Sequence, residues 1–445
     1  MKRKMSILLC AALSLSLLAG CGTEDAGSEG SGSEGSGEGS GASGEEITLS
    51  IGGWGYNDYF VPVLQREFNK KYPGITLEYE RMEQADYLNK LKVNLSAGTS
   101  WDIMMLEAGS MLNAVESYCE PLDEYAKAEW GDNWKEKFEE AAISTVESED
   151  GHVYGLPDSM GQAGLLMYNK TKLEKYGIEV PQTYEELKDY CDKLRADGDL
   201  PLVIGGKDDW ILTDMFLVIA NDIAPGKIVQ ADAGEIEWTD PDIVKAFEMW
   251  QQMFEDGIFQ DGCLGVPQYP GASELFWLNG KGGMLAEGDW TIATFTNEDM
   301  AEAANKDEYV MAPMPDMDGD GEVAGPVYTT GVLYAINKDL PDEKKEAAWN
   351  YIKWFIGEEG QQVMNGPEIG YASTPAFKDI TIERTSDYPN YINCMKDVEE
   401  TLPLVSGPRN LNNVDAKAAL GEVLQELGTG MSPEDAAAKV QAAME

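Results

Sequence analysis

Aromatic residues beside carboxylates or glycine-rich turns are the most chemically suggestive feature of this 445-residue chain. Asp289 and Trp290 are adjacent, and Trp210 precedes Asp214 by one helical turn. A flat aromatic face with hydrogen-bonding neighbours suits a pyranose ring, whose C–H face stacks on it while the hydroxyls donate to Asp or Glu. The predicted ligand-binding residues are Trp54, Tyr56, Glu107, Trp210, Asp214, Asp289, Trp290, Tyr328 and Tyr371.

Catalytic and cofactor motifs are not found in this sequence. GxSxG, P-loop and dinucleotide-binding patterns are absent, and a single histidine, His152, with scattered cysteines makes a zinc site improbable. With 80 acidic residues an acid/base pair could always be found by searching, so such a pair carries no specificity. We expect no enzyme, no cofactor and no metal.

The loop Asp316-x-Asp318-x-Asp320-Gly321 begins like an EF-hand. Its twelfth position is Val327, where calcium coordination needs a bidentate glutamate. We favour a solvated acidic turn, with calcium binding as the alternative.

The formal charge of -47 argues against nucleic-acid or anionic-lipid partners. Solubility is the first interpretation of this charge, and concentration of cationic ligands is the alternative.

Alternating strands and helices must position the candidate residues. A strand over 46–52, a helix that stops at Pro73 and a strand from Ile75 predict a βαβ unit, with Trp54 in the turn after its first strand. Ligands of open α/β sheets bind at the carboxyl ends of strands, where Glu107 also falls. The alternative to a ligand-binding role for Trp54 is packing in the hydrophobic core.

Helix signals continue along the chain. Thr183 and Glu186 form a capping box for a helix over 184–196, and Ser432 with Pro433 begins the last helix. About four hundred residues remain after the N-terminal segment, which exceeds one usual core. Two α/β lobes are therefore expected.

The N-terminus is typical of export. Lys2, Arg3 and Lys4 precede an apolar run from Ile7 that is too short to span a bilayer. The end of this segment, Leu18-Ala-Gly-Cys21, resembles a bacterial lipobox, which implies cleavage after residue 20 and lipid on Cys21; an ordinary signal peptide is the alternative. Residues 21–45 then form a flexible Gly/Ser/Glu linker.

Four cysteines remain beyond the export segment, and they are far apart in the sequence. The sequence is compatible with buried free thiols and with one or two disulfides. These residues are Cys119, Cys191, Cys263 and Cys394.

Short segments spread from about Ile47 to the C-terminus resemble, in their order and spacing, the extracellular solute-binding proteins (family 1) of ABC importers, the sugar-binding group similar to maltose-binding protein. The segments are Phe68-Asn-Lys-Lys-Tyr-Pro-Gly-Ile-Thr-Leu, Tyr154-Gly-Leu-Pro, Leu166-Met-Tyr-Asn-Lys, Pro181-Gln-Thr-Tyr-Glu-Glu-Leu, Gly280-Lys-Gly-Gly-Met-Leu-Ala-Glu-Gly-Asp-Trp290 and Glu346-Ala-Ala-Trp-Asn-Tyr-Ile.

This resemblance implies an α/β, two-lobed periplasmic-binding-protein-like fold (type II), with discontinuous lobes and a ligand cleft at the hinge. The chain would cross between lobes near Pro157, Pro326 and Tyr371. Lobe 1 would comprise 46–157 and 327–370, and lobe 2 would comprise 158–326 and 371–445.

The resemblance also assigns roles. Trp290 matches a sugar-stacking tryptophan of maltose-binding protein, Glu107 falls near a contacting strand, and Trp210 lies near a third contacting segment. Trp101 replaces the proline that is usual in the family, so it is expected to pack in the lobe or to add a platform.

We therefore expect a monomeric, non-enzymatic protein, anchored through Cys21 on the extracellular face of a Gram-positive membrane. It would capture a carbohydrate, in particular an oligosaccharide, and deliver it to an ABC permease when the lobes close. The alternatives are a binding protein for polyamines or other small solutes, a secreted carbohydrate-active enzyme and an adhesive wall protein.

Overall fold

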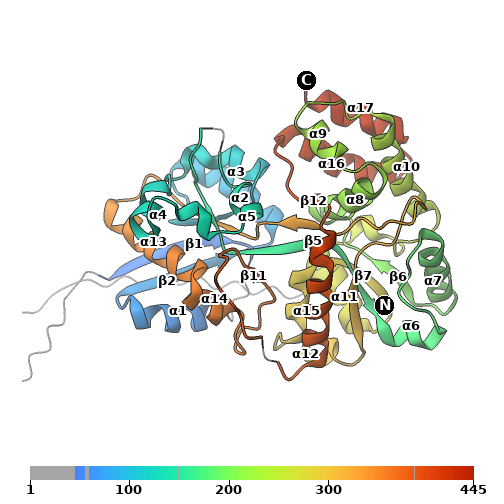
Figure 1. The fold of residues 1–445 in the computed structure, drawn as a ribbon, viewed down its shortest axis with the longest axis horizontal. Coiled ribbons are helices and arrows are strands. Elements are labelled where there is room, and N and C mark those ends of the chain that lie inside the picture. Colours follow the sequence, from blue (N-terminus) through green and yellow to red (C-terminus); the bar gives the residue numbers. More distant parts are fainter. Residues whose placement is uncertain (1–45, 56–59, 149, 385) are drawn as a thin grey trace, which may run out of the picture. The chain divides into compact units, whose positions relative to one another are not determined.

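The structure is a computed structural model, and it describes residues 46–55, 60–148, 150–384 and 386–445. These residues belong to one compact unit, Glu45–Glu445 (Figure 1). The export signal, the lipid-modified Cys21 and the linker expected within 1–45 lie outside the described residues, and so does Tyr56.

The first sheet begins with the predicted βαβ unit, which is confirmed. β1 pairs in parallel with β2 and with β3, and β10 pairs with β3 in the antiparallel sense, with Leu333 opposite Leu106. All four residues of β3 are buried, as a central strand requires. The strands, in sheet order, are β2 (Ile75–Arg81), β1 (Ile47–Gly53), β3 (Ile103–Leu106), β10 (Leu333–Ile336) and β4 (Leu156–Pro157).

Helices and one core surround this sheet. Trp101 is buried within that core, and a Cβ on Gly52 would lie 2.2 Å from its ring, so this tryptophan packs inside the lobe. The helices are α1 (Phe60–Lys71), α2 (Gln84–Ala97), α3 (Ser110–Val115), α4 (Asp123–Trp130), α5 (Glu140–Ile143), α13 (Asp342–Ile356) and α14 (Glu358–Met364).

The second sheet is organised around the long strand β5. One part of β5 pairs with β9 and β11, and its other part pairs with β7 and β8. The strands are β5 (Ser159–Asn169), β6 (Leu200–Val203), β7 (Gly282–Gly288), β8 (Tyr309–Ala312), β9 (Val327–Thr329), β11 (Thr374–Pro375) and β12 (Gly407–Pro408).

We call the first sheet with its helices the first body, and the second sheet with its helices the second body. The helices of the second body pack on its sheet and on one another. α8, α10, α16 and α17 form a group in which α16 contacts all three others (Figure 1). The helices are α6 (Lys170–Tyr176), α7 (Tyr184–Ala196), α8 (Asp209–Ile223), α9 (Lys227–Asp232), α10 (Pro241–Glu255), α11 (Ser273–Asn279), α12 (Ala301–Ala304), α15 (Pro389–Thr401), α16 (Val414–Leu427) and α17 (Pro433–Ala443).

The chain passes between the two sheets more than once. β4 of the first sheet leads through Asp158 directly into β5 of the second. Val327–Thr329 pairs within the second sheet and Leu333–Ile336 within the first, so this passage falls after Thr329, slightly later than the boundary expected at Pro326. Each body is thus built from discontinuous segments.

Local predictions agree with the structure at several positions. Thr183 and Ser432 cap their helices by accepting hydrogen bonds from the backbone N–H groups of Glu186 and Asp435. The four cysteines left open by the sequence are buried free thiols. In the described part of the chain, no helix combines the length and apolar character that crossing a membrane requires.

Candidate functional site

Arg409 is the centre of a cluster that joins the two bodies. Its Nε lies 2.7 Å from Oδ1 of Asp214 on α8, and its Nη1 lies 3.1 Å from Oε1 of Glu107, which follows β3. Lys417 of α16 approaches Oε2 of Glu107 at 3.3 Å, and Gln84 Nε2 donates to Oε1 at 3.0 Å. We call Glu107, Asp214, Arg409 and Lys417 the charged end of the site.

Burial and pairing act in opposite directions on these charges. Burial alone would raise the pKa of Glu107, but Lys417 and Arg409 lower it to about 2. Two carboxylates face Arg409, so its pKa is raised and it stays charged despite its burial. Burial and the nearby Glu107 raise the pKa of Asp214, and Arg409 and Lys417 only partly offset that rise. Its Oδ2 has no hydrogen-bond partner among the described residues.

Three half-buried rings adjoin this charged end. The rings of Trp210 and Tyr269 are nearly parallel, with an interplanar angle of 8° and centroids 6.2 Å apart, and the centroid of Trp290 lies 6.1 Å from that of Trp210. Cζ of Arg409 stands 5.7 Å from the Trp210 ring and 5.5 Å from the Trp290 ring, within cation–π range.

Glu287 on β7 supports two of these rings. Its side chain is completely buried, Oε1 accepts hydrogen bonds from Tyr269 OH at 2.6 Å and from Gln268 Nε2 at 2.8 Å, and Oε2 accepts one from Trp290 Nε1 at 2.6 Å. Burial raises its pKa to about 7, and the three donors only partly offset that rise. We call Trp210, Tyr269, Glu287 and Trp290 the aromatic end of the site.

The local sequence explains how these side chains are placed. Oδ2 of Asp208, just before α8, accepts the backbone N–H of Gln268 at 2.8 Å, which ties the start of α8 to the turn that carries Tyr269. Gly288 leaves room for Trp290, because a Cβ there would lie 2.2 Å from its ring. The backbone N–H of Arg409 donates to the carbonyl of Tyr328 at 2.8 Å, which fixes the guanidinium beside β9.

The structure brings some of the sequence-predicted residues together. Glu107, Trp210, Asp214 and Trp290 lie in the cluster, and Tyr328 adjoins it through its backbone.

The other predicted residues have packing or backbone partners outside the cluster, although Asp289 directly precedes Trp290 and Tyr371 lies near Tyr269. The ring of Trp54 packs 5.4 Å from that of Tyr87 at the first core, and Tyr371 meets Phe60 edge-on at 6.2 Å. Asp289 is buried, accepts the backbone N–H of Gln162 at 3.1 Å and has its pKa raised to about 7 by burial.

Sequence reasoning did not identify Arg409, Lys417, Tyr269 or Glu287. Glu287 had a detectable signal, since it is a lone carboxylate within the apolar strand before Trp290. Arg409 had none, because its partners are far away in the sequence.

The acidic loop after β8 uses its carboxylates on its own backbone. Asp316 accepts the N–H groups of Gly319 and Gly321. Oxygens of Asp222 on α8, Asp316 and Asp318 also come within 4.8 Å of one another, a spacing at which three carboxylates could hold a metal ion.

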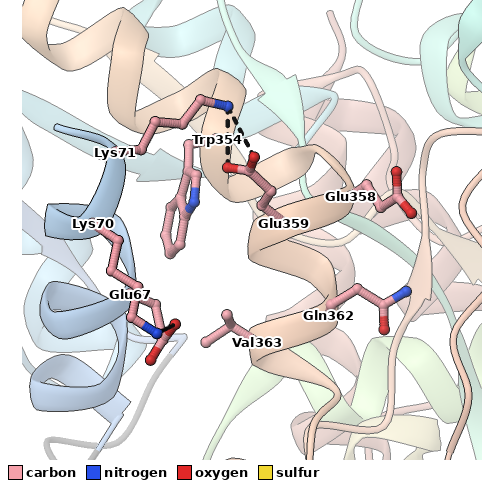
Figure 2. Close-up of a pocket in the computed structure, with 8 residues that line it drawn as sticks. All are labelled: Glu67, Lys70, Lys71, Trp354, Glu358, Glu359, Gln362 and Val363. Carbon is pink, nitrogen blue, oxygen red and sulfur yellow. Dashed lines mark hydrogen bonds and ion pairs between the residues drawn. The ribbon is translucent and has the colours of Figure 1, made fainter.

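A surface pocket of about 640 Å³ lies elsewhere, between α1 and α14 on the first body (Figure 2). Lys71 Nζ is paired with Glu359 at 3.1 Å, Lys70 is paired with Glu67, and the Trp354 ring at its wall is buried. The pocket offers no open aromatic face and its lysines are already paired, so we place the candidate site at the Arg409 cluster.

Comparisons with known proteins agree with this architecture. The family model described as bacterial extracellular solute-binding protein matches residues 64–391. A binding protein of Brucella abortus (strain 2308) is 28% identical over 327 residues, which cover 72% of this chain and 74% of that protein. The alpha-glucosides-binding periplasmic protein AglE of Rhizobium meliloti (strain 1021) is 24% identical over 72% of this chain and 71% of its own length.

Solved structures share the two-lobed fold. The maltose-bound MalE3 of T. maritima superposes with a TM-score of 0.73 at 20% identity, over 89% of this chain and 98% of that one. This likeness confirms the predicted α/β, two-lobed fold class.

Proposed function

This chain belongs to the family of bacterial extracellular solute-binding proteins, and we propose that it captures a carbohydrate for an ABC importer. The observation that carries the proposal is the set of half-buried rings of Trp210, Tyr269 and Trp290 beside Arg409. Aromatic faces next to charge-assisted donors suit sugar rings and their hydroxyls. The relatives named for alpha-glucosides and maltose support this class of ligand.

The charge balance of the site favours a neutral ligand. Glu107 and Asp214 are already neutralised by Arg409 and Lys417, so they offer little to a polyamine. A cation would have to displace these partners from buried carboxylates, at high cost. Several adjacent rings further favour an oligosaccharide over a single sugar.

Isothermal titration calorimetry of the full chain, in a detergent without a sugar headgroup, tests the proposal. Maltotriose, a chitin oligosaccharide, a xylan oligosaccharide and spermidine are titrated separately, and each mixture is then analysed for cleavage products. We expect one oligosaccharide to bind at micromolar Kd or tighter, which requires about 8 kcal/mol, and to be recovered intact. Binding of spermidine alone would contradict the carbohydrate assignment, and cleaved sugar would contradict the non-enzymatic role.

We also propose that Cys21 carries the lipid that holds the protein at the extracellular face of the membrane, with residues 22–45 as a tether. The lipobox-like segment and the Gly/Ser/Glu composition support this, and the length of the tether favours a Gram-positive cell. Replacement of Cys21 by Ser should move the protein from the membrane fraction to the medium, and mass spectrometry of the wild-type N-terminal peptide should show the lipid. Equal membrane retention of both proteins would refute the anchor.

Delivery to a permease would follow closure of the two bodies around the sugar, in a protein that acts as a monomer. Closure requires the ligand to bind the closed state more tightly than the open one. Small-angle X-ray scattering should show a smaller radius of gyration with bound oligosaccharide, and an unchanged radius would argue against closure.

A further inference from the structure

Glu287 differs from every other carboxylate of the site, because no cation pairs with it among the described residues. Its side-chain hydrogen-bond partners are neutral donors: the phenol of Tyr269, the indole N–H of Trp290 and the amide of Gln268. It is also 0% exposed, so a ligand on the rings would not touch it.

One carboxylate therefore fixes the orientation of two rings that come from separate parts of the chain. Trp290 lies two residues after the end of β7, whereas Tyr269 belongs to the turn Gln268–Ala272. Trp290 Nε1 also donates to Tyr269 OH at 3.2 Å, which closes a small network on Glu287. The β7 strand that carries this carboxylate is buried along its whole length and paired on both sides, so it holds Glu287 in a fixed position.

We propose that Glu287 is a positioning residue, which holds Trp290 and Tyr269 in the orientation that the sugar meets and so makes sugar affinity depend on its ionisation. This inference rests on the proposed function for the identity of the ligand. The geometric arrangement of the rings can be tested without any ligand.

Protonation should disturb this arrangement, because each oxygen of Glu287 is approached by a donor. A neutral carboxyl has to donate its own proton, and its hydrogen-bond partners offer it no acceptor unless one of these bonds is lost. The rise of its pKa to about 7 puts this change in the neutral range. Several other titratable or charged groups lie around this network, next to Glu287, to its partners or to the neighbouring strand. They are Tyr269, Tyr371, Asp208, Asp214, Asp289 and Arg409.

Glu287→Gln in the full chain is the decisive variant, since it keeps the volume and removes the ionisation. In the ligand-free wild type, the near-UV circular dichroism of the clustered rings should titrate between pH 6 and pH 8, and this titration should vanish in Glu287→Gln. For maltotriose, if only the ionised form orders the rings, wild-type affinity should fall about tenfold from pH 8 to pH 6, because the competent fraction falls by that factor. The variant should bind more weakly at pH 8 and show no pH dependence over this range.

Two further variants keep the test decisive. Tyr269→Phe keeps the ring but removes one donor to the ionised carboxylate, so the spectral midpoint should move to higher pH even if Glu287→Gln fails to fold. Asp289→Asn removes the neighbouring carboxyl whose pKa is also about 7, and the spectral titration should persist in this control.

A spectral titration that survives in Glu287→Gln, or a midpoint that does not move in Tyr269→Phe, would overturn the inference. If no oligosaccharide binds the wild type, the proposed function fails, while the spectra still decide whether Glu287 orders the rings.

Discussion

Glu107 and Glu287 are both buried carboxylates of one site, yet their pKa values are about 2 and about 7. Cations surround Glu107 at the charged end, whereas neutral donors surround Glu287 at the aromatic end. Hydrogen bonds from neutral groups only partly offset the effect of burial on the pKa of Glu287, whereas nearby positive charges more than offset it at Glu107. The charged end should therefore matter most for stability, and the aromatic end for recognition and pH response.

Removal of the shared cation should have the largest effect. Arg409→Met leaves Glu107 and Asp214 buried without their main partner, and the free energy of unfolding at pH 7 should fall by about 3–5 kcal/mol. Urea denaturation followed by circular dichroism measures this loss. A loss below about 1 kcal/mol would mean that water or relaxation replaces the cation, and that the two ends do not differ as we argue.

Glu287→Gln should change the stability profile with pH. The folded-state pKa of Glu287 is raised from 4.5 to about 7, so the folded protein holds this proton more tightly than the unfolded chain. Its contribution is therefore fully present below pH 4.5 and is lost as the pH rises through 7. Relative to wild type, the variant should gain about 3 kcal/mol between pH 4 and pH 8 in denaturation experiments. If the free energies of unfolding of the variant and the wild type differed by the same amount at pH 4 and pH 8, the elevated pKa would be contradicted.

Trp290→Ala should weaken sugar binding without a comparable loss of stability. A sugar face that covers on the order of 80 Å² of the ring is worth about 2 kcal/mol, or roughly a thirtyfold rise in Kd. Calorimetry with the oligosaccharide that binds wild type measures it. Trp130→Ala is the matched control: this half-buried tryptophan packs against Trp349 in the first body, so its loss should leave Kd unchanged. Equal losses in both variants would indicate a general structural effect.

Lys417→Met should have the smallest effect of the series. Its amine is partly exposed and lies 3.3 Å from Glu107, which retains Arg409 and Gln84. We expect a loss of about 1 kcal/mol in the free energy of unfolding. The loss of stability at acidic pH should also begin at a higher pH, because one cation no longer lowers the pKa of Glu107. A loss as large as that of Arg409→Met would show that the two cations act as one unit.

The sequence predicted the elements well where the signal was local. The alternation of β1 and β2, the helix over 184–196 and its cap follow from periodicity and from side-chain hydrogen bonds within a few residues. Two lobes and their approximate passages came from chain length and from family resemblance.

The candidate site was only partly predictable, because it depends on contacts between distant segments. Trp210, Trp290, Glu107 and Asp214 could be selected as aromatic residues and carboxylates near strand or helix ends. No local pattern connects Arg409 to Glu107, since packing of the second body against the first brings them together. Trp54 met the same local criterion but packs beside Tyr87, so the criterion selects residue types and not their surroundings.

The antiparallel neighbour of β3 is β10, and this pairing sets the order in which the chain can fold. Leu106 is made early in synthesis, but its partner Leu333 emerges only after the whole first part of the second sheet has been produced. Until then, the apolar edge of Ile103–Leu106 has no permanent partner, and such edges promote aggregation. Nascent chains that stop before Leu333 should therefore depend on chaperones, and the first body should become resistant to protease only after the second has begun to form.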